Sequence, residues 1–147
     1  MEQYPNEFIR GIANANELNS EGNASVSMFI FRNNPKRNDD KIEELSINWC
    51  DDKESSISIA MNQKKTDGSI QFKTGVAVLS REVLDMVKKA PVFMKNLNYE
   101  RAPEEDNAFH GNIICTAGLT KPIMDVIRSS LVLCVTSIIL RETITNP

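Results

Sequence analysis

The sequence has few of the residues on which common catalytic and metal sites depend. It contains one histidine, His110, and three cysteines that stand alone without a CxxC pair. It has no GxSxG nucleophile motif and no glycine-rich phosphate-binding loop. Because a zinc site needs several nitrogen or sulfur ligands, we expect no metal and no cofactor.

Long apolar stretches are missing as well. The longest, Leu131–Leu140, has ten residues, which is about half of the roughly 20 that a membrane-spanning helix needs. The chain does not open with a basic region followed by an apolar core, as a signal peptide does. An odd number of isolated cysteines is typical of reduced thiols. We therefore expect a cytoplasmic protein that does not contact membranes.

The composition is that of a soluble globular protein. Its 147 residues are 41% hydrophobic and 25% charged, which favours one domain over residues 1–147. Seventeen Lys and Arg face twenty Asp and Glu, and the basic residues are scattered along the chain. Nucleic-acid-binding domains concentrate positive charge on one face, so direct binding of nucleic acid is not expected. Assembly of identical copies stays open.

Alternating apolar residues predict the strands. Runs of β-branched and aromatic residues with a period of two are typical of sheets. The first such run is apolar on both faces, which predicts a central strand. The Asp67-Gly68 pair is a hairpin signal. The predicted strands are Ser25–Arg32, Glu44–Trp49, Ser55–Met61, Ser69–Leu79, Lys95–Tyr99 and Asn112–Thr116.

Two helices have clear start signals. Ser80 is an N-cap for a helix over Arg81–Ala90, which Pro91 ends. Thr120 caps a long C-terminal helix that runs to about Arg141, with Pro122 in its first turn.

Two other segments are less clear-cut. The C-terminal helix is rich in β-branched residues, so Leu133–Leu140 also fits a strand. Near the N-terminus, apolar pairs four residues apart predict a short helix within Tyr4–Leu18, and residues 1–20 fit a peripheral docking helix.

These elements predict the fold class. Strands followed by helices favour an α+β domain over a doubly wound parallel sheet. We expect an antiparallel or mixed sheet of about five to six strands. The long C-terminal helix and the shorter helix should pack on one face of this sheet.

The stretch from Tyr99 to Asn112 is the candidate site. His110 is a candidate general base, with Asp106 or Glu105 as its carboxylate partner. The alternative is a structural histidine whose ring nitrogens bind backbone groups, beside a solvated acidic loop. The candidate binding residues are Arg101, Asn107, His110 and Asn112.

Two short segments resemble a loosely defined set of small bacterial proteins. Leu45–Trp49 reads LSINW and Asn107–Ile113 reads NAFHGNI. The set combines an early LSVNW-type strand with a late NPYHGNI-type segment and a C-terminal helix. Ala108 stands where that pattern often has proline. The resemblance implies a bacterial source and a compact accessory domain, and it carries no activity.

Three functions are compatible with the sequence. The first is a non-enzymatic accessory protein that binds another protein, as a small component of a bacterial toxin or phage-defence system. The second is a small hydrolase or nuclease that uses His110 with a nearby carboxylate. The third is a ligand-sensing or nucleotide-binding module, which would need a concave pocket with converging polar groups.

Overall fold

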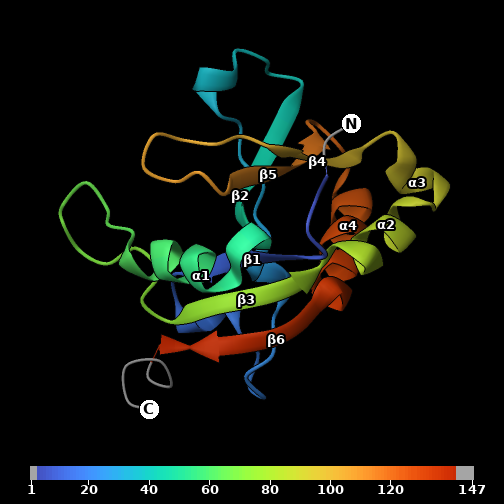
Figure 1. Ribbon diagram of the computed structural model, residues 1–147. Helices are drawn as coiled ribbons and strands as arrows, with labels where there is room; N and C mark the ends of the chain where they lie inside the picture. The colour runs from blue at the N-terminus through green and yellow to red at the C-terminus, as the bar shows by residue number, and fades with distance from the viewer. Residues whose placement is uncertain (1–2, 142–147) are drawn as a thin grey trace.

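The structure is a six-stranded antiparallel sheet with helices on both faces (Figure 1). The computed structural model describes residues 3–141, apart from the side chains of Val92 and Met94. The strand order is β4-β5-β2-β1-β3-β6. The strands are β1 (Glu7–Ile12), β2 (Ile42–Trp49), β3 (Gly75–Ser80), β4 (Leu97–Arg101), β5 (His110–Thr116) and β6 (Val135–Leu140).

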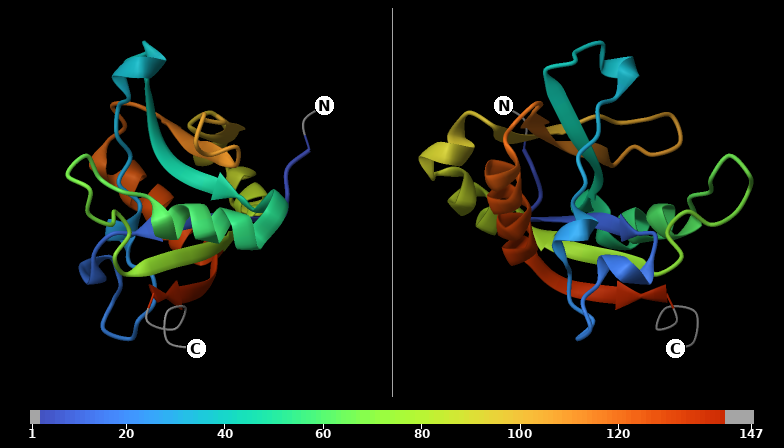
Figure 2. Two further views of the ribbon diagram at one scale, coloured as in Figure 1. Left: turned by 60° about the vertical axis from the view of Figure 1, so that its left-hand side comes forward. Right: turned by 180° about the vertical axis from the view of Figure 1, so that it is seen from behind.

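The helices divide between the two faces of the sheet (Figures 1 and 2). They are α1 (Lys53–Asn62), α2 (Arg81–Lys88), the single turn α3 (Pro91–Met94) and α4 (Lys121–Cys134). Helices α2 and α4 pack together on one face, and α1 covers the other. The predicted α+β class is therefore confirmed, although the C-terminal helix has 14 residues and is shorter than expected.

Each face of the sheet carries its own apolar core. The larger core includes Phe8, Leu45, Trp49, Leu84 and Ile127, and it lies under α2 and α4. The smaller core lies under α1 and includes Ile9, Ala60, Met61, Val76 and Val78. Among the helices within residues 3–141, none combines the length and apolarity needed to cross a membrane.

The prediction of an N-terminal helix is wrong, because this segment forms β1 at the centre of the sheet. Phe8 and Ile12 pack into the larger core, while Ile9 packs into the smaller one. A strand buried on both faces has no simple alternation, so its apolar pairs imitated a helix. Gly11 fits this tightly packed strand because it has no side chain, and a Cβ atom there would collide with the Phe72 ring.

The predicted strand Ser25–Arg32 is also wrong. Its first part is a 3-10 turn over Val26–Met28, and only Arg32 pairs with a strand, through an isolated bridge to Glu44. β1 takes the central place in the sheet instead. The aromatic residues of this segment are still buried, because Phe29 and Phe31 fill the larger core from an irregular backbone.

The predicted strand Ser55–Met61 is helical and belongs to α1. Asp52 caps this helix, since its carboxylate accepts the Ser55 N–H at 3.2 Å. Ser56 and Ala60 are buried and lie four residues apart on the face that meets the sheet. The apolar positions of this segment fit the period of a strand as well as that of a helix. Asp52, the capping residue, is the sequence signal that favours the helix.

The other predictions hold in part. Ser80 caps α2 as expected, and its hydroxyl accepts the Val83 N–H at 3.3 Å. Within Ser69–Leu79, the strand begins only at Gly75. The strand alternative near the C-terminus is correct, because the chain leaves α4 at Cys134 and continues directly as β6.

Candidate functional site

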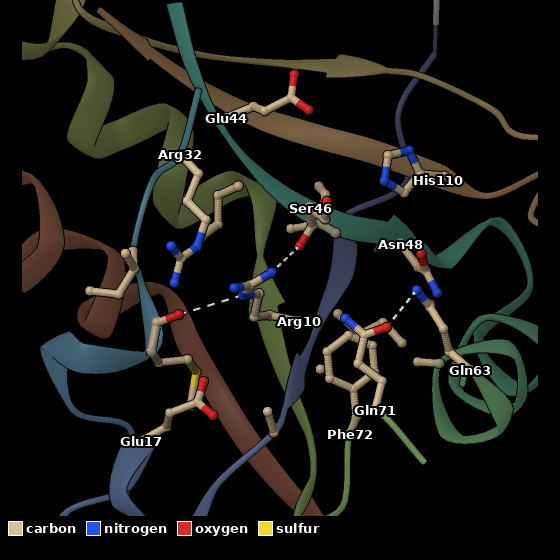
Figure 3. Close-up of a pocket in the computed structure, with 18 of the residues that line it drawn as sticks. Arg10, Glu17, Arg32, Glu44, Ser46, Asn48, Gln63, Gln71, Phe72 and His110 are labelled. Atoms are coloured by element: carbon tan, nitrogen blue, oxygen red, sulfur yellow. Dashed lines mark hydrogen bonds between the residues drawn. The ribbon is translucent and has the colours of Figure 1, made fainter. Parts of the chain in front are cut away.

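The site begins where two central strands separate. β1 and β2 pair only through Phe8 with Trp49 and Ile9 with Asn48. Beyond these pairs β1 stays with β3, and β2 stays with β5. The space between the separating strands is a groove of about 670 Å³, which we call the central groove (Figure 3). The segment 27–35, the end of α1, and residues Gln71, Phe72, Glu104 and His110 complete its walls.

Main-chain groups of both strands face this groove. Glu44 exchanges both of its main-chain hydrogen bonds with Arg32, on the side away from β5. Because main-chain direction alternates along a strand, the N–H and C=O groups of Ser46 point to the same side. On β1, the Ile12 carbonyl accepts the Thr74 N–H on the β3 side. The N–H and C=O groups of Gly11, the residue before it, therefore point toward β2. The edges of β1 and β2 therefore face each other across the central groove without pairing.

Arg10 holds the two separating strands together. Its Nη1 donates to the Ser46 carbonyl at 2.9 Å, and its Nε donates to the Met28 carbonyl at 3.5 Å (Figure 3). Burial lowers the pKa of Arg10 to about 10, with Glu17 raising it and Arg32 lowering it further. Within residues 3–141, Arg10 forms no ion pair with a carboxylate.

His110 is the first residue of β5 and lines the groove at the end away from Arg10. Its Nδ1 is 2.8 Å from the Ala102 carbonyl oxygen. A carbonyl only accepts hydrogen bonds, so Nδ1 carries the proton and Nε2 is the free acceptor. The nearest carboxylate oxygen is Oε1 of Glu104, 3.8 Å from Nδ1. The backbone therefore fixes the ring through Nδ1, and the ring also lines the groove.

A buried amide pair joins Asn48, which lines the groove, to Asn107 in the loop before β5. The Nδ2 of Asn107 donates to Oδ1 of Asn48 at 2.8 Å. The Nδ2 of Asn48 donates in turn to the Ser56 carbonyl of α1 at 3.2 Å. Asn48 and Asn107 are both buried. This chain of bonds fixes the loop before β5 against β2 and α1.

A second, smaller hollow of about 270 Å³ adjoins the central groove and shares His110 with it. Arg37 lies across it and binds the carboxylates of Glu44 and Glu100. The Glu100 carboxylate also accepts from Nδ2 of Asn112 at 2.9 Å. Burial would raise the pKa of Glu100, but the bonds from Arg37 and Asn112 outweigh it and lower that pKa. The Oδ1 of Asn112 is buried without a hydrogen-bond partner among the described residues.

The structure separates the residues proposed from the sequence. His110 lines both hollows and Asn112 lines the smaller one, whereas Asn107 is buried and lines neither. Glu105 and Asp106 are exposed and line neither hollow. Arg101 also lines neither, because it binds Asp51 through two nitrogens and lies over the Tyr4 ring.

Sequence reasoning missed Arg10, Arg32 and Ser46. Arg10 and Arg32 come from segments whose structure was predicted wrongly, whereas Ser46 lies on β2, which was predicted as a strand. One signal was present in the sequence. Arg10 stands between Ile9 and Gly11 in an apolar stretch, and a cation in a buried strand needs a specific reason.

The remaining chemistry of the described residues is limited. Within residues 3–141, no group of three side chains is placed to hold a metal ion. Cys50, Cys115 and Cys134 are free thiols, and burial raises the pKa of each. No family model, curated protein or solved structure matches the chain. The arrangement provides fixed hydrogen-bond donors and acceptors along an open groove, which suits binding.

Proposed function

We propose that this protein is a non-enzymatic binding module that holds an extended segment of a partner protein in the central groove. The observation that carries this proposal is the separation of β1 from β2, which leaves two strand edges facing one open space. Extended peptides bind sheet edges through main-chain hydrogen bonds, and neighbouring pockets select their side chains. The resemblance to bacterial accessory proteins adds a toxin or phage-defence context to the hypothesis.

Several features of the groove support an extended polypeptide as its ligand. Its volume of about 670 Å³ lies within the roughly 300–1,000 Å³ that is usual for small-molecule pockets, so the groove is large enough to hold a ligand. Ser46 is exposed, although it lies on a strand flanked by buried Leu45 and Ile47. The side chains of Gln63 and Gln71 bind each other at 3.1 Å on the opposite wall. The groove thus offers main-chain and amide groups, which match the peptide backbone.

Photo-crosslinking tests this proposal. A benzophenone amino acid replaces Ser46 in the full chain, and the control replaces Ser129, an exposed residue of α4 outside the groove. In an extract of the native host, we expect the Ser46 probe alone to crosslink one polypeptide, at a short segment that mass spectrometry identifies. A synthetic copy of this segment should slow amide exchange at Gly11 and Ser46. Equal crosslinking from both positions, or unchanged exchange, would contradict the proposal.

The hydrolase or nuclease alternative rests on a different observation, the orientation of His110. With Nδ1 bound to Ala102, Nε2 is the acceptor, as a general base requires. Its expected partners Asp106 and Glu105 are exposed and do not line the groove. A His110→Gln variant that retains the crosslinked segment favours the binding module. Cleavage of that segment by the wild type, but not by the variant, favours the enzyme.

A further inference from the structure

Two arginine side chains reach the same part of the central groove. Arg10 enters from β1, and Arg32 enters from the segment that pairs with β2 (Figure 3). Arg10 is fixed by the carbonyls of Ser46 and Met28, so its position does not depend on a ligand. Arg32 is exposed, and its positive charge disfavours the charged form of Arg10.

The carboxylates around them do not neutralise this pair. Within residues 3–141, neither Arg10 nor Arg32 forms an ion pair. Glu44 lines the groove but binds Arg37. Glu17 accepts the Asn14 N–H at 2.7 Å and acts on Arg10 only from beyond ion-pairing distance.

We propose that the groove binds a carboxylate between Arg10 and Arg32, and that an acidic side chain of the bound segment supplies it. This inference rests on the proposed function, because it gives the chemistry of the segment that the groove would hold. Two like charges in one groove repel each other, and an anion between them converts this repulsion into two attractions. A guanidinium presents paired N–H donors that match both oxygens of a carboxylate.

The partial burial of Arg10 makes the site selective. A partly buried cation without a counter-ion is unfavourable, so an incoming carboxylate gains more here than at an exposed arginine. Because the carbonyl bonds hold the Arg10 side chain in place, little conformational entropy is lost when the ligand binds. A neutral side chain of the same shape would leave Arg10 without a counter-ion. We therefore expect discrimination between glutamate and glutamine.

Small probes test the carboxylate site without knowledge of the partner. The full chain, labelled with ¹⁵N, is titrated with N-acetyl-glutamic acid α-amide, with N-acetyl-glutamine amide, and with N-acetyl-alanine, which carries only a terminal carboxylate. Sodium chloride keeps the ionic strength constant. We expect saturable shifts of the Arg10 Nε–H and the Ser46 amide with the glutamic acid probe, and none with the glutamine probe.

An Arg32→Gln variant provides the matched test, because no described contact depends on the Arg32 guanidinium. It should weaken binding of the glutamic acid probe about fivefold, the upper range for a partly exposed ion pair. The control is Lys89→Gln, which removes the same charge from an exposed residue at the end of α2. The control should bind the probe as the wild type does. Equal losses in both variants would mean that only net charge matters, and would overturn the inference.

The remaining outcomes separate this inference from the proposed function. Absence of saturable shifts, together with a specific crosslink from Ser46, overturns the carboxylate site and leaves the binding module standing. Binding of N-acetyl-alanine as tight as that of the glutamic acid probe overturns the assignment to a side chain. Specific binding of the glutamic acid probe without any crosslinked polypeptide supports the carboxylate site and contradicts the peptide-binding function.

Discussion

The side-chain amide of Asn107 donates to Oδ1 of Asn48 at 2.8 Å, although 59 residues separate them in the sequence. Asn107 lies in the loop between β4 and β5, and Asn48 lies on β2 at the last pair before β1 and β2 separate. Asn48 also donates to Ser56 of α1. One amide thus joins the loop, the sheet and the helix at the rim of the central groove.

An Asn107→Ala substitution should therefore destabilise the protein. It leaves Oδ1 of Asn48 buried without its donor, which costs about 1–3 kcal/mol. Urea unfolding measures this change. Hydrogen exchange of the variant should be faster than that of the wild type in residues 103–109 and unchanged in α4. An Asp106→Ala control, which changes an exposed neighbour, should stay within about 0.5 kcal/mol of the wild type. Equal stability of the two variants would mean that the amide pair contributes nothing.

Sequence reasoning worked where a local signal was unambiguous. Ser80 marked the start of α2, and the alternation of Leu45, Ile47 and Trp49 marked β2 with the correct buried face. Trp49 is fully buried on the apolar side of this alternation, and its indole N–H donates to the Glu100 carbonyl at 3.1 Å. These features depend on neighbours in the sequence, which a single chain reveals.

Sequence reasoning failed where a strand is buried on both faces, because such a strand lacks the alternation of apolar and polar residues. β1 is buried on both faces, so Phe8 and Ile12, four residues apart, gave a helical spacing in a strand. The central groove arises from the separation of β1 and β2, and strand pairing between distant segments is not encoded in any local pattern. The position of Arg10 across that separation could therefore not be predicted, whereas His110 was found because it is the one histidine.

The ion pairs of Arg37 over the smaller hollow predict that its mutation lowers the free energy of unfolding in a pH-dependent way. Hydrogen bonds from Arg37 and Asn112 lower the pKa of Glu100 despite its burial. A carboxyl group with a lowered pKa in the folded state stabilises that state above its unfolded pKa, and this contribution disappears as the pH falls through the folded pKa. An Arg37→Gln variant should thus be about 1–2 kcal/mol less stable than the wild type at pH 7.

This difference should shrink as the pH falls below about 4.5, where the carboxyl of an unfolded chain becomes protonated. Urea unfolding of the wild type and of Arg37→Gln from pH 7 to pH 3 provides the measurement. The Lys89→Gln variant, whose charge lies outside both hollows, is the control. A difference that is constant over this range would show that Arg37 acts through packing rather than through the Glu100 charge.

The three thiols should react slowly in the folded protein. Burial raises the pKa of Cys134 to about 12 and the pKa values of Cys50 and Cys115 to about 11. The thiolate is the reactive form. At pH 8, alkylation by iodoacetamide should be about a hundredfold slower at Cys50 and Cys115, and about a thousandfold slower at Cys134, than in the urea-unfolded chain. Mass spectrometry gives the rate at each cysteine, and fast labelling of folded Cys50 would show that its thiol is more accessible than the structure indicates.

The tautomer of His110 follows from its backbone contact and decides what the ring offers to the groove. Because the Ala102 carbonyl accepts from Nδ1 at 2.8 Å, the neutral imidazole should carry its proton on Nδ1 and leave Nε2 as the acceptor. Long-range ¹H–¹⁵N spectra near pH 8 distinguish the two tautomers, and the chain has no other histidine to overlap. A predominant Nε2–H tautomer would contradict the Ala102 bond and would make His110 a donor to the bound segment.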